Sequence, residues 1–275
     1  MHPGELARAI ASLELTNAAL VDCTANPSVV DAYAEFIDAN LHIITPNKRA
    51  NVLPWRRYAA LLELLERRQR HFLYEANVGA GLPVMSTVRD LIASGDRVDK
   101  VEGVLSGTLS YLFNTFDGRA PFSALVEQAR ARGLTEPDPR EDLSGQDVGR
   151  KLLILARQIG WQIDMKDIQV QSLVKGRSLA GYDRDLARRL QRARSRGAVL
   201  RYVGTLKGGR GRAGIQEFPR EHPFATTRGS DNILAFTTKR YAHTPLVLQG
   251  PGAGADVTAM GVFSDVLKLL HYLPE

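Results

Sequence analysis

Apolar residues in the first half of the chain fall into short runs separated by stretches of helical spacing. The runs 17–22 (NAALVD) and 41–45 (LHIIT) predict two strands, and residues 27–39 between them predict a helix. A strand, a helix and a strand within about thirty residues form a βαβ unit, so we expect a parallel sheet whose first strand is buried. Polar Thr24 and Lys48 follow these strands, at the edge where open parallel sheets bind ligands.

The segment that follows predicts helices and strands around a glycine-bearing turn at 77–82. The apolar spacing indicates strands at 71–76 and 100–105, and helices at 55–70, from Pro83, after Ser106 and at 121–132. In the turn several backbone carbonyls point inward and Glu75 adds one charge, an arrangement that could hold a hard cation. A tight strand-to-helix turn explains the same residues at least as well.

The second half of the chain predicts an antiparallel component. Residues 168–174 alternate between apolar and polar, and four further strands are expected at 199–203, 214–218, 232–238 and 245–249. The Gly/Arg-rich segment 207–212 is typical of a hairpin tip. Helices are expected at 182–196 and 259–271.

Five carboxylates precede one lysine in the stretch 133–151. Two prolines predict an extended loop at 135–140, and Ser144 is a plausible N-cap for the helix that follows. Asp147 and Lys151 lie four residues apart and therefore share one face of that helix. This arrangement suits a small cationic substrate with proton chemistry beside it. A capped surface helix with an ordinary ion pair is the alternative. The carboxylates are Glu136, Asp138, Glu141, Asp142 and Asp147.

Composition narrows the class of protein. Hydrophobic content of 44% and charged content of 24% are typical of a soluble globular protein, and no apolar run approaches the ~20 residues of a membrane span. The first fifteen residues lack a signal-peptide core, so a cytoplasmic location is expected. A single cysteine excludes an intrachain disulfide and a cysteine-built zinc site.

The net charge of +6 is modest, and it would favour an anionic ligand or simple solubility. Six arginines lie in 182–196, but Asp183 and Asp185 dilute them and no aromatic residues interleave. We therefore expect a solvated helix face and no nucleic-acid partner. No GxGxxG motif follows a strand near the N-terminus, so glycine spacing alone does not predict a nucleotide-binding fold.

Seven stretches taken together resemble homoserine dehydrogenase, most closely the form fused behind aspartokinase in bifunctional bacterial enzymes. The resemblance covers nearly the whole chain in order. Two departures stand out: the family's strand, glycine-rich loop and helix that bind the cofactor phosphates are expected to be missing before residue 1, and Gly149 replaces a common alanine. The stretches are 21–26 (VDCTAN), 45–51 (TPNKRAN), 73–84 (LYEANVGAGLPV), 103–113 (GVLSGTLSYLF), 133–157 (GLTEPDPREDLSGQDVGRKLLILAR), 199–204 (VLRYVG) and 250–265 (GPGAGADVTAMGVFSD).

The resemblance implies reversible hydride transfer between NAD(P)H and aspartate 4-semialdehyde, giving homoserine, in the biosynthesis of threonine, methionine and isoleucine. It implies that Lys151 is the proton donor and that Lys48 is a second lysine near nicotinamide and substrate. It further implies substrate ligands at Glu136 and Asp142, with Asp147 close by. The chemistry is consistent, because an alkoxide needs a cation or proton donor beside it, and carboxylates suit an ammonium group.

The resemblance also implies a cofactor, an ion and a partner. The cofactor is NADP or NAD, the ion is sodium, and the partner beside the amino-acid substrate is a second copy in a homodimer or other homo-oligomer. Cofactor contacts are implied at Thr24, Lys48, Gly133, Gly252 and Gly254. The sodium site is implied at Glu75 with the backbone oxygens of Val78, Ala80 and Leu82.

We therefore expect an α/β protein with a partial Rossmann-like parallel sheet and a mixed α+β domain. Residues 1–70, completed by 246–275, would form a truncated nucleotide-binding domain, and 71–245 the catalytic and dimerisation domain. Two alternatives stay open. The chain could be an inactive or dimerisation fragment that lacks the glycine-rich dinucleotide loop. It could also be an acylating semialdehyde dehydrogenase, for which Cys23 at the end of a strand expected to be buried is poorly placed.

Overall fold

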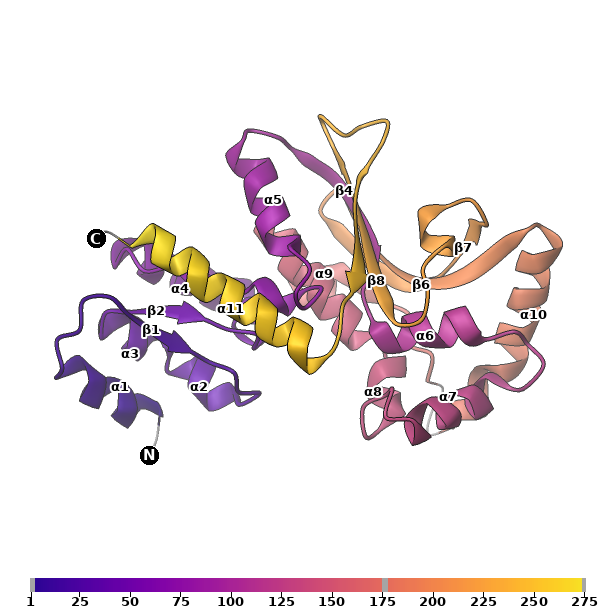
Figure 1. The fold of residues 1–275 in the computed structure, drawn as a ribbon, viewed down its shortest axis with the longest axis horizontal. Coiled ribbons are helices and arrows are strands. Elements are labelled where there is room, and N and C mark those ends of the chain that lie inside the picture. Colours follow the sequence, from indigo (N-terminus) through magenta and orange to yellow (C-terminus); the bar gives the residue numbers. More distant parts are fainter. Residues whose placement is uncertain (1–2, 175–177, 274–275) are drawn as a thin grey trace. The chain divides into compact units, whose positions relative to one another are not determined.

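The computed structural model describes residues 3–174 and 178–273, which form two compact units. Unit 1 contains residues 1–87 and 254–275, and unit 2 contains 88–253 (Figure 1). These units overlap the expected domains 1–70 with 246–275 and 71–245, whose functional division stays a prediction. The α/β class is confirmed, since one unit carries a parallel sheet and the other a mixed one.

Unit 1 contains a three-stranded parallel sheet in the order β1 (Ala18–Val21), β2 (Leu41–Ile44), β3 (Phe72–Leu73). The expected βαβ unit is therefore present. Two expectations were wrong. β1 alternates between half-buried and exposed residues, with Val21 44% exposed, and Cys23 after it is exposed. The strand predicted at 71–76 ends at Leu73, because residues Glu75–Asn77 form a turn of 3₁₀ helix.

The helices of unit 1 follow the predicted spacing with one break. The helix expected at 27–39 is two helices that meet at Ala32, and Asn26 caps the first by accepting a hydrogen bond from the Ser28 amide. The last helix begins four residues before its predicted start. The bounds are α1 (Pro3–Ala11), α2 (Pro27–Asp31), α3 (Tyr33–Asp38), the 3₁₀ turn η1 (Ala50–Val52), α4 (Trp55–Arg67), α5 (Val84–Ala93), which continues into unit 2, and α11 (Ala255–Tyr272).

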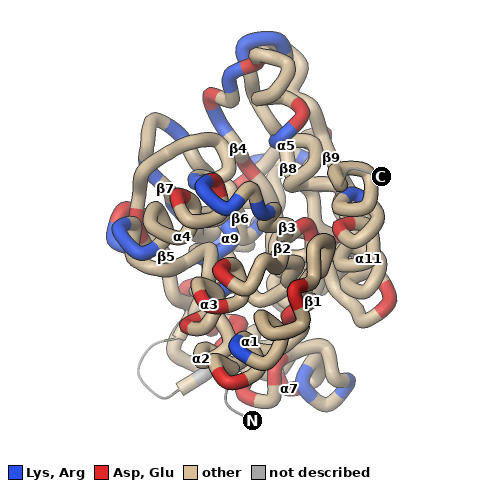
Figure 2. Tube along the Cα trace, turned by 90° about the vertical axis from the view of Figure 1, so that its left-hand side faces the viewer, with Lys and Arg blue, Asp and Glu red and all other residues tan. Residues whose placement is uncertain are grey.

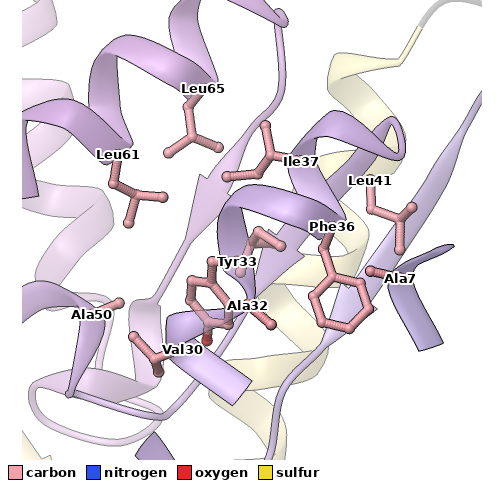
Figure 3. Close-up of a cluster of buried hydrophobic side chains, with 11 residues drawn as sticks. Ala7, Val30, Ala32, Tyr33, Phe36, Ile37, Leu41, Ala50, Leu61 and Leu65 are labelled. Carbon is pink, nitrogen blue, oxygen red and sulfur yellow. The ribbon is translucent and has the colours of Figure 1, made fainter. Parts of the chain in front are cut away.

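Both faces of this sheet are packed. Leu41 and Ile43 point to one face, where they meet side chains of α1, α3 and α4 (Figure 3). Ile44 and Leu73 point to the other face, where Leu269 of α11 covers them. Each fully buried side chain of this size contributes about 1.5–3 kcal/mol, so the two clusters hold the strand ends in place.

A buried histidine makes the stability of unit 1 dependent on pH. His42 is 1% exposed, and its Nδ1 accepts a hydrogen bond from the His71 amide at 2.9 Å. Burial, together with Arg70 and His71, lowers the pKa of His42 from 6.5 to about 4. A histidine with a lowered pKa stabilises the fold above its unfolded pKa, and this contribution disappears as the pH falls towards 4.

We expect the free energy of unfolding to fall by about 2 kcal/mol as the pH decreases over this interval, and His42→Gln to remove most of that dependence. Urea unfolding across the pH range measures it. The exposed His243 supplies the matched control, since His243→Gln should keep the wild-type slope. An unchanged slope in His42→Gln would show that another group titrates.

Unit 2 contains a six-stranded sheet in the order β5-β7-β6-β4-β8-β9. All pairs are antiparallel except β5 with β7, and the tip at 208–209 joins β6 to β7 as a hairpin, as predicted. The strands are β4 (Val98–Val104), β5 (Ile168–Val170), β6 (Ala198–Lys207), β7 (Arg210–Pro219), β8 (Asp231–Thr238) and β9 (Leu246–Pro251).

The acidic stretch of unit 2 folds differently from the prediction. The extended loop stops at Asp138, and a short helix α8 (Pro139–Leu143) follows. Ser144 ends α8, and its hydroxyl also accepts a hydrogen bond from the Gln146 amide, the first of the next helix, at 3.2 Å. Helix α9 (Gln146–Gln158) begins after Gly145, whose φ of 69° is a left-handed conformation. The hydroxyl of Tyr202 lies where a Cβ would be, so only glycine fits there.

The remaining helices pack beside this sheet or connect its strands. In α10, Leu186, Leu190 and Ala193 are buried. On the other face Arg189 pairs with Asp185, and Arg194 donates to the Asp117 carbonyl. Basic and acidic segments are interspersed along the chain (Figure 2). Among the described residues no helix is long and apolar enough to cross a membrane. The bounds are α6 (Gly107–Thr115), α7 (Phe122–Ala131), η3 (Met165–Asp167), η4 (Leu179–Tyr182), α10 (Asp183–Ser195) and η5 (Pro223–Ala225).

Candidate active site

In unit 1 a buried aspartate organises the polar ends of β1 and β2. The carboxylate of Asp22, 2% exposed, accepts hydrogen bonds from the Thr24 hydroxyl at 2.6 Å and the Asn47 amide nitrogen at 3.2 Å. Its backbone oxygen accepts one from the Thr45 hydroxyl. Thr24 and half-buried Lys48, the residue after Asn47, are therefore presented from one sheet edge, as expected from parallel strands.

In unit 2 the ammonium of Lys151 is held at two points. It donates to the backbone oxygen of Leu105 at 2.7 Å and forms an ion pair with Asp147 at 2.9 Å, confirming the predicted i,i+4 pair. Lys151 is only 9% exposed, whereas the Asp147 side chain is 42% exposed. A buried ammonium needs such partners, because an unpaired one would lose its hydration without compensation.

The acidic loop before α9 is ordered by its own carboxylates. The carboxylate of Asp142 accepts a hydrogen bond from the backbone amide of Glu136 at 2.8 Å. Glu136 itself is exposed. Asp138 instead binds Arg140, whose hydrogen bonds lower the pKa of that carboxyl. Within this loop, Glu136 and Asp142 are therefore joined by a hydrogen bond, whereas the charge of Asp138 is neutralised by Arg140.

The glycines expected to contact a cofactor lie in different settings. Gly133 is exposed after α7, and Gly254 precedes the first turn of α11. Gly252 is buried, and a Cβ there would lie 1.5 Å from Oδ1 of Asn232, so no larger residue fits. Sequence spacing alone gives no reason for this last constraint.

A groove of about 490 Å³ lies within unit 1, between the start of α11 and the ends of the first two strands. Its walls are mainly apolar, as in most sites that bind small molecules. The residues around it are Cys23, Pro46, Gly254, Ala255, Thr258, Ala259, Val262, Phe263 and Val266.

The carboxylate of Glu75 is committed to protein groups. It is buried and accepts hydrogen bonds from the Met85 amide, the Ser86 hydroxyl and the Lys268 ammonium, the last at 2.7 Å. Asp265, also buried, accepts a hydrogen bond from the Glu75 amide at 2.6 Å. Across residues 3–174 and 178–273, no three His, Cys, Asp or Glu side chains are arranged to hold a metal.

The structure gathers the predicted residues into two groups, one in each unit. Unit 1 holds Thr24, Lys48, Glu75, Gly254 and the turn at 78–82, and unit 2 holds Gly133, Glu136, Asp142, Asp147, Lys151 and Gly252. Three polar residues with structural partners at these places were not singled out from the sequence: Asp22, Asn232 and Lys268. Asp22 could have been found as the first polar residue after a strand. The partners of Asn232 are distant in sequence, and so are Glu75 and Ser86, which Lys268 binds in addition to the nearby Asp265.

Comparison with known proteins agrees with the two units. A family model described as homoserine dehydrogenase matches residues 83–267, and one described as the homoserine dehydrogenase NAD binding domain matches 3–75. A crystal structure of a Candida auris protein of unknown function has a TM-score of 0.91 and 38% identity, covering 97% of this chain and 80% of that one.

Two curated relatives show how much of a longer protein the match spans. The chloroplastic bifunctional aspartokinase/homoserine dehydrogenase 1 of Zea mays is 48% identical over 94% of this chain, which spans only 30% of that relative's length. The homoserine dehydrogenase of Paracoccidioides brasiliensis is 40% identical over 93% of this chain and 75% of its own length. On these grounds, the chain belongs to the homoserine dehydrogenase family.

Proposed function

We propose that this chain catalyses the reversible, NAD(P)H-dependent interconversion of aspartate 4-semialdehyde and homoserine. The observation that carries the proposal is the buried ammonium of Lys151, fixed by the Leu105 carbonyl and Asp147. Aldehyde reduction converts the carbonyl oxygen into an alkoxide, and a fixed ammonium both stabilises that charge and supplies the proton. The half-exposed carboxylate of Asp147 gives Lys151 a route to regain a proton from water.

Glu136 and Asp142 are proposed to bind the ammonium of the amino-acid substrate. Asp142 is already oriented by the Glu136 amide, so one carboxylate is positioned and the other is on an exposed segment. Charge-assisted hydrogen bonds between carboxylate and ammonium are stronger than neutral ones and give both affinity and orientation. Lys48 is proposed as a second cation near the reacting carbonyl.

The cofactor proposal fits the residues present. The match of 3–75 to an NAD-binding domain and the groove beside Cys23 and Gly254 support a dinucleotide in unit 1. Its proposed contacts are Thr24, Lys48, Gly133, Gly252 and Gly254. When bound, NAD(P)H supplies the hydride, and the protein supplies position and charge.

A sodium ion fits only part of the predicted ligand set. The Glu75 carboxylate is not suited to a cation, because the Lys268 ammonium at 2.7 Å already neutralises it and would repel a second positive charge. The backbone oxygens of Val78, Ala80 and Leu82 stay in the proposal. A rise in melting temperature with sodium, absent with a bulky organic cation, would support such a site, and equal melting temperatures would contradict it.

We extend the proposal to a homodimer formed through unit 2. Lys100 and Glu102 pair on the face of its sheet that also carries Thr205 and Gln216, which share a hydrogen bond. A charged, half-exposed sheet face of this kind suits a second copy. Light scattering measures the mass of the particle in solution, and a monomer at micromolar concentration would contradict the proposed homodimer.

We also propose a cytoplasmic location for the protein, which cell fractionation tests.

The reaction is tested by mixing the purified chain with homoserine and NADP or NAD at alkaline pH. Absorbance of the reduced nicotinamide reports turnover, and titration calorimetry reports cofactor binding in parallel. Turnover with homoserine but not with 2-aminobutyrate, which lacks the hydroxyl, supports the proposal. A folded chain that does not turn over homoserine contradicts it.

Replacing Glu136 by glutamine is expected to raise KM for homoserine about 10- to 100-fold while changing kcat little. The reason is that a hydrogen bond to a charged group contributes about 1.5–3 kcal/mol, and this one would form equally in substrate and transition state. Glu141→Gln, an exposed carboxylate in the same loop, is the matched control. An equal effect in both variants would show a general electrostatic attraction instead of a binding contact.

A further inference from the structure

We infer that Asn232 is a positioning residue of this reaction, acting on Lys151 through the end of β4. The inference rests on the proposed role of Lys151. Asn232 lies in β8 and is 1% exposed. Its carboxamide touches two segments of unit 2. One is the end of β4, next to the Leu105 carbonyl that binds Lys151, and the other is the loop with the predicted cofactor residue Gly252.

The first contact is with the strand that holds the lysine. The Asn232 Nδ2 donates to the backbone oxygen of Val104 at 2.9 Å, and the oxygen of the next residue, Leu105, accepts from Lys151 at 2.7 Å. These two carbonyls belong to consecutive residues. A shift of the backbone at Val104 therefore displaces the acceptor that fixes the ammonium, and a small misplacement of a reacting group costs a large factor in rate.

The second contact is with the glycine loop. The Asn232 Oδ1 is inaccessible to solvent and has no hydrogen-bond partner among residues 3–174 and 178–273. It lies so close to the backbone of Gly252 that a Cβ there would be only 1.5 Å away. The same side chain thus fixes the spacing between the Gly252 loop and the end of β4.

The unpaired oxygen argues against a purely structural role. A buried acceptor without a partner costs free energy, and an apolar side chain of similar shape would avoid that cost. Leucine would fill the space but could not hold the Val104 carbonyl. The amide is therefore suited to setting the position of the backbone beside Lys151, at some expense of stability.

The test compares Asn232→Leu with Asn114→Leu, which removes a partly buried amide of the same unit that binds the Gly229 oxygen. We expect Asn232→Leu to lower kcat about 10- to 100-fold with KM nearly unchanged, and Asn114→Leu to leave both unchanged.

Two further comparisons separate the inference from its premise. In a Lys151→Met background, Asn232→Leu should cause no further loss, because the two residues act through one group. If Asn232→Leu does not fold, the smaller Asn232→Ala replaces it in each comparison. An unchanged kcat in a folded Asn232 variant overturns the inference while the function stands. Full activity in Lys151→Met overturns the proposed function itself.

Discussion

Replacing Lys151 by methionine is expected to lower kcat for homoserine oxidation about 10²- to 10⁴-fold. Methionine keeps much of the buried stem but has no proton to exchange and no positive charge to stabilise an alkoxide. The fold should survive, because the Asp147 partner is 42% exposed and can be solvated once the ammonium is gone. KM for homoserine should change less than kcat, since the lost interaction forms chiefly in the transition state.

Steady-state kinetics of the purified variant measure this effect, and circular dichroism verifies the fold. The exposed Lys207 at the β6–β7 tip is the matched control, and Lys207→Met should retain wild-type kcat. Lys151→Arg restores charge but holds its proton too tightly to exchange it, so it should remain poorly active. A Lys151→Met variant with near-normal kcat would remove the assigned role.

Removing the ammonium of Lys268 is expected to lower the free energy of unfolding by about 3 kcal/mol, more than the change expected from the titration of His42. This group lies 2.7 Å from Glu75 and 3.4 Å from Asp265, two carboxylates that are each 1% exposed. Burial already raises the pKa of Asp265. Lys268→Met would leave both carboxylates without their shared cation.

The loss should depend on pH. A carboxyl whose folded pKa is raised stabilises the fold when protonated and loses this contribution as the pH rises, so Lys268→Met should be least stable at neutral or higher pH. Urea unfolding measures the difference. A second change, Glu75→Gln, should restore part of the stability by removing one buried charge. Loss equal to that of the exposed control Lys239→Met would contradict the prediction.

Elements with a strong apolar pattern could be predicted from the sequence, and elements decided by tertiary contacts could not. The runs at 17–22 and 41–45 predicted β1 and β2 because a short apolar run between polar segments indicates a strand, although only β2 is fully buried. The N-cap of α9 was predicted at Ser144 and lies one residue later, at Gly145, because the fit of Gly145 beneath Tyr202 depends on a strand far along the chain. Cys23 was expected near a buried strand and is exposed, since β1 is packed less fully than its composition indicates.

The candidate site divides in the same way. The Asp147–Lys151 pair follows from helical periodicity and was predicted. The Leu105 carbonyl that completes the lysine site is 46 residues away, and Lys268 is 193 residues from Glu75. Such contacts leave no local pattern in the sequence. The sequence therefore indicates a cation ligand at Glu75 but gives no sign of Lys268, which neutralises that carboxylate.

Unit 1 is built from two segments that are distant in sequence, 1–87 and 254–275, and this sets an order for folding during synthesis. Residues 88–253 leave the ribosome before 254–275, so unit 2 has all its strands while the sheet of unit 1 still lacks helix α11. About 180 residues separate Leu73 from α11, so for on the order of ten seconds at typical translation rates Ile44 and Leu73 have no α11 side chain to cover them. The nascent chain therefore exposes one apolar sheet face until α11 emerges. A chaperone would be most useful to the chain during this exposure.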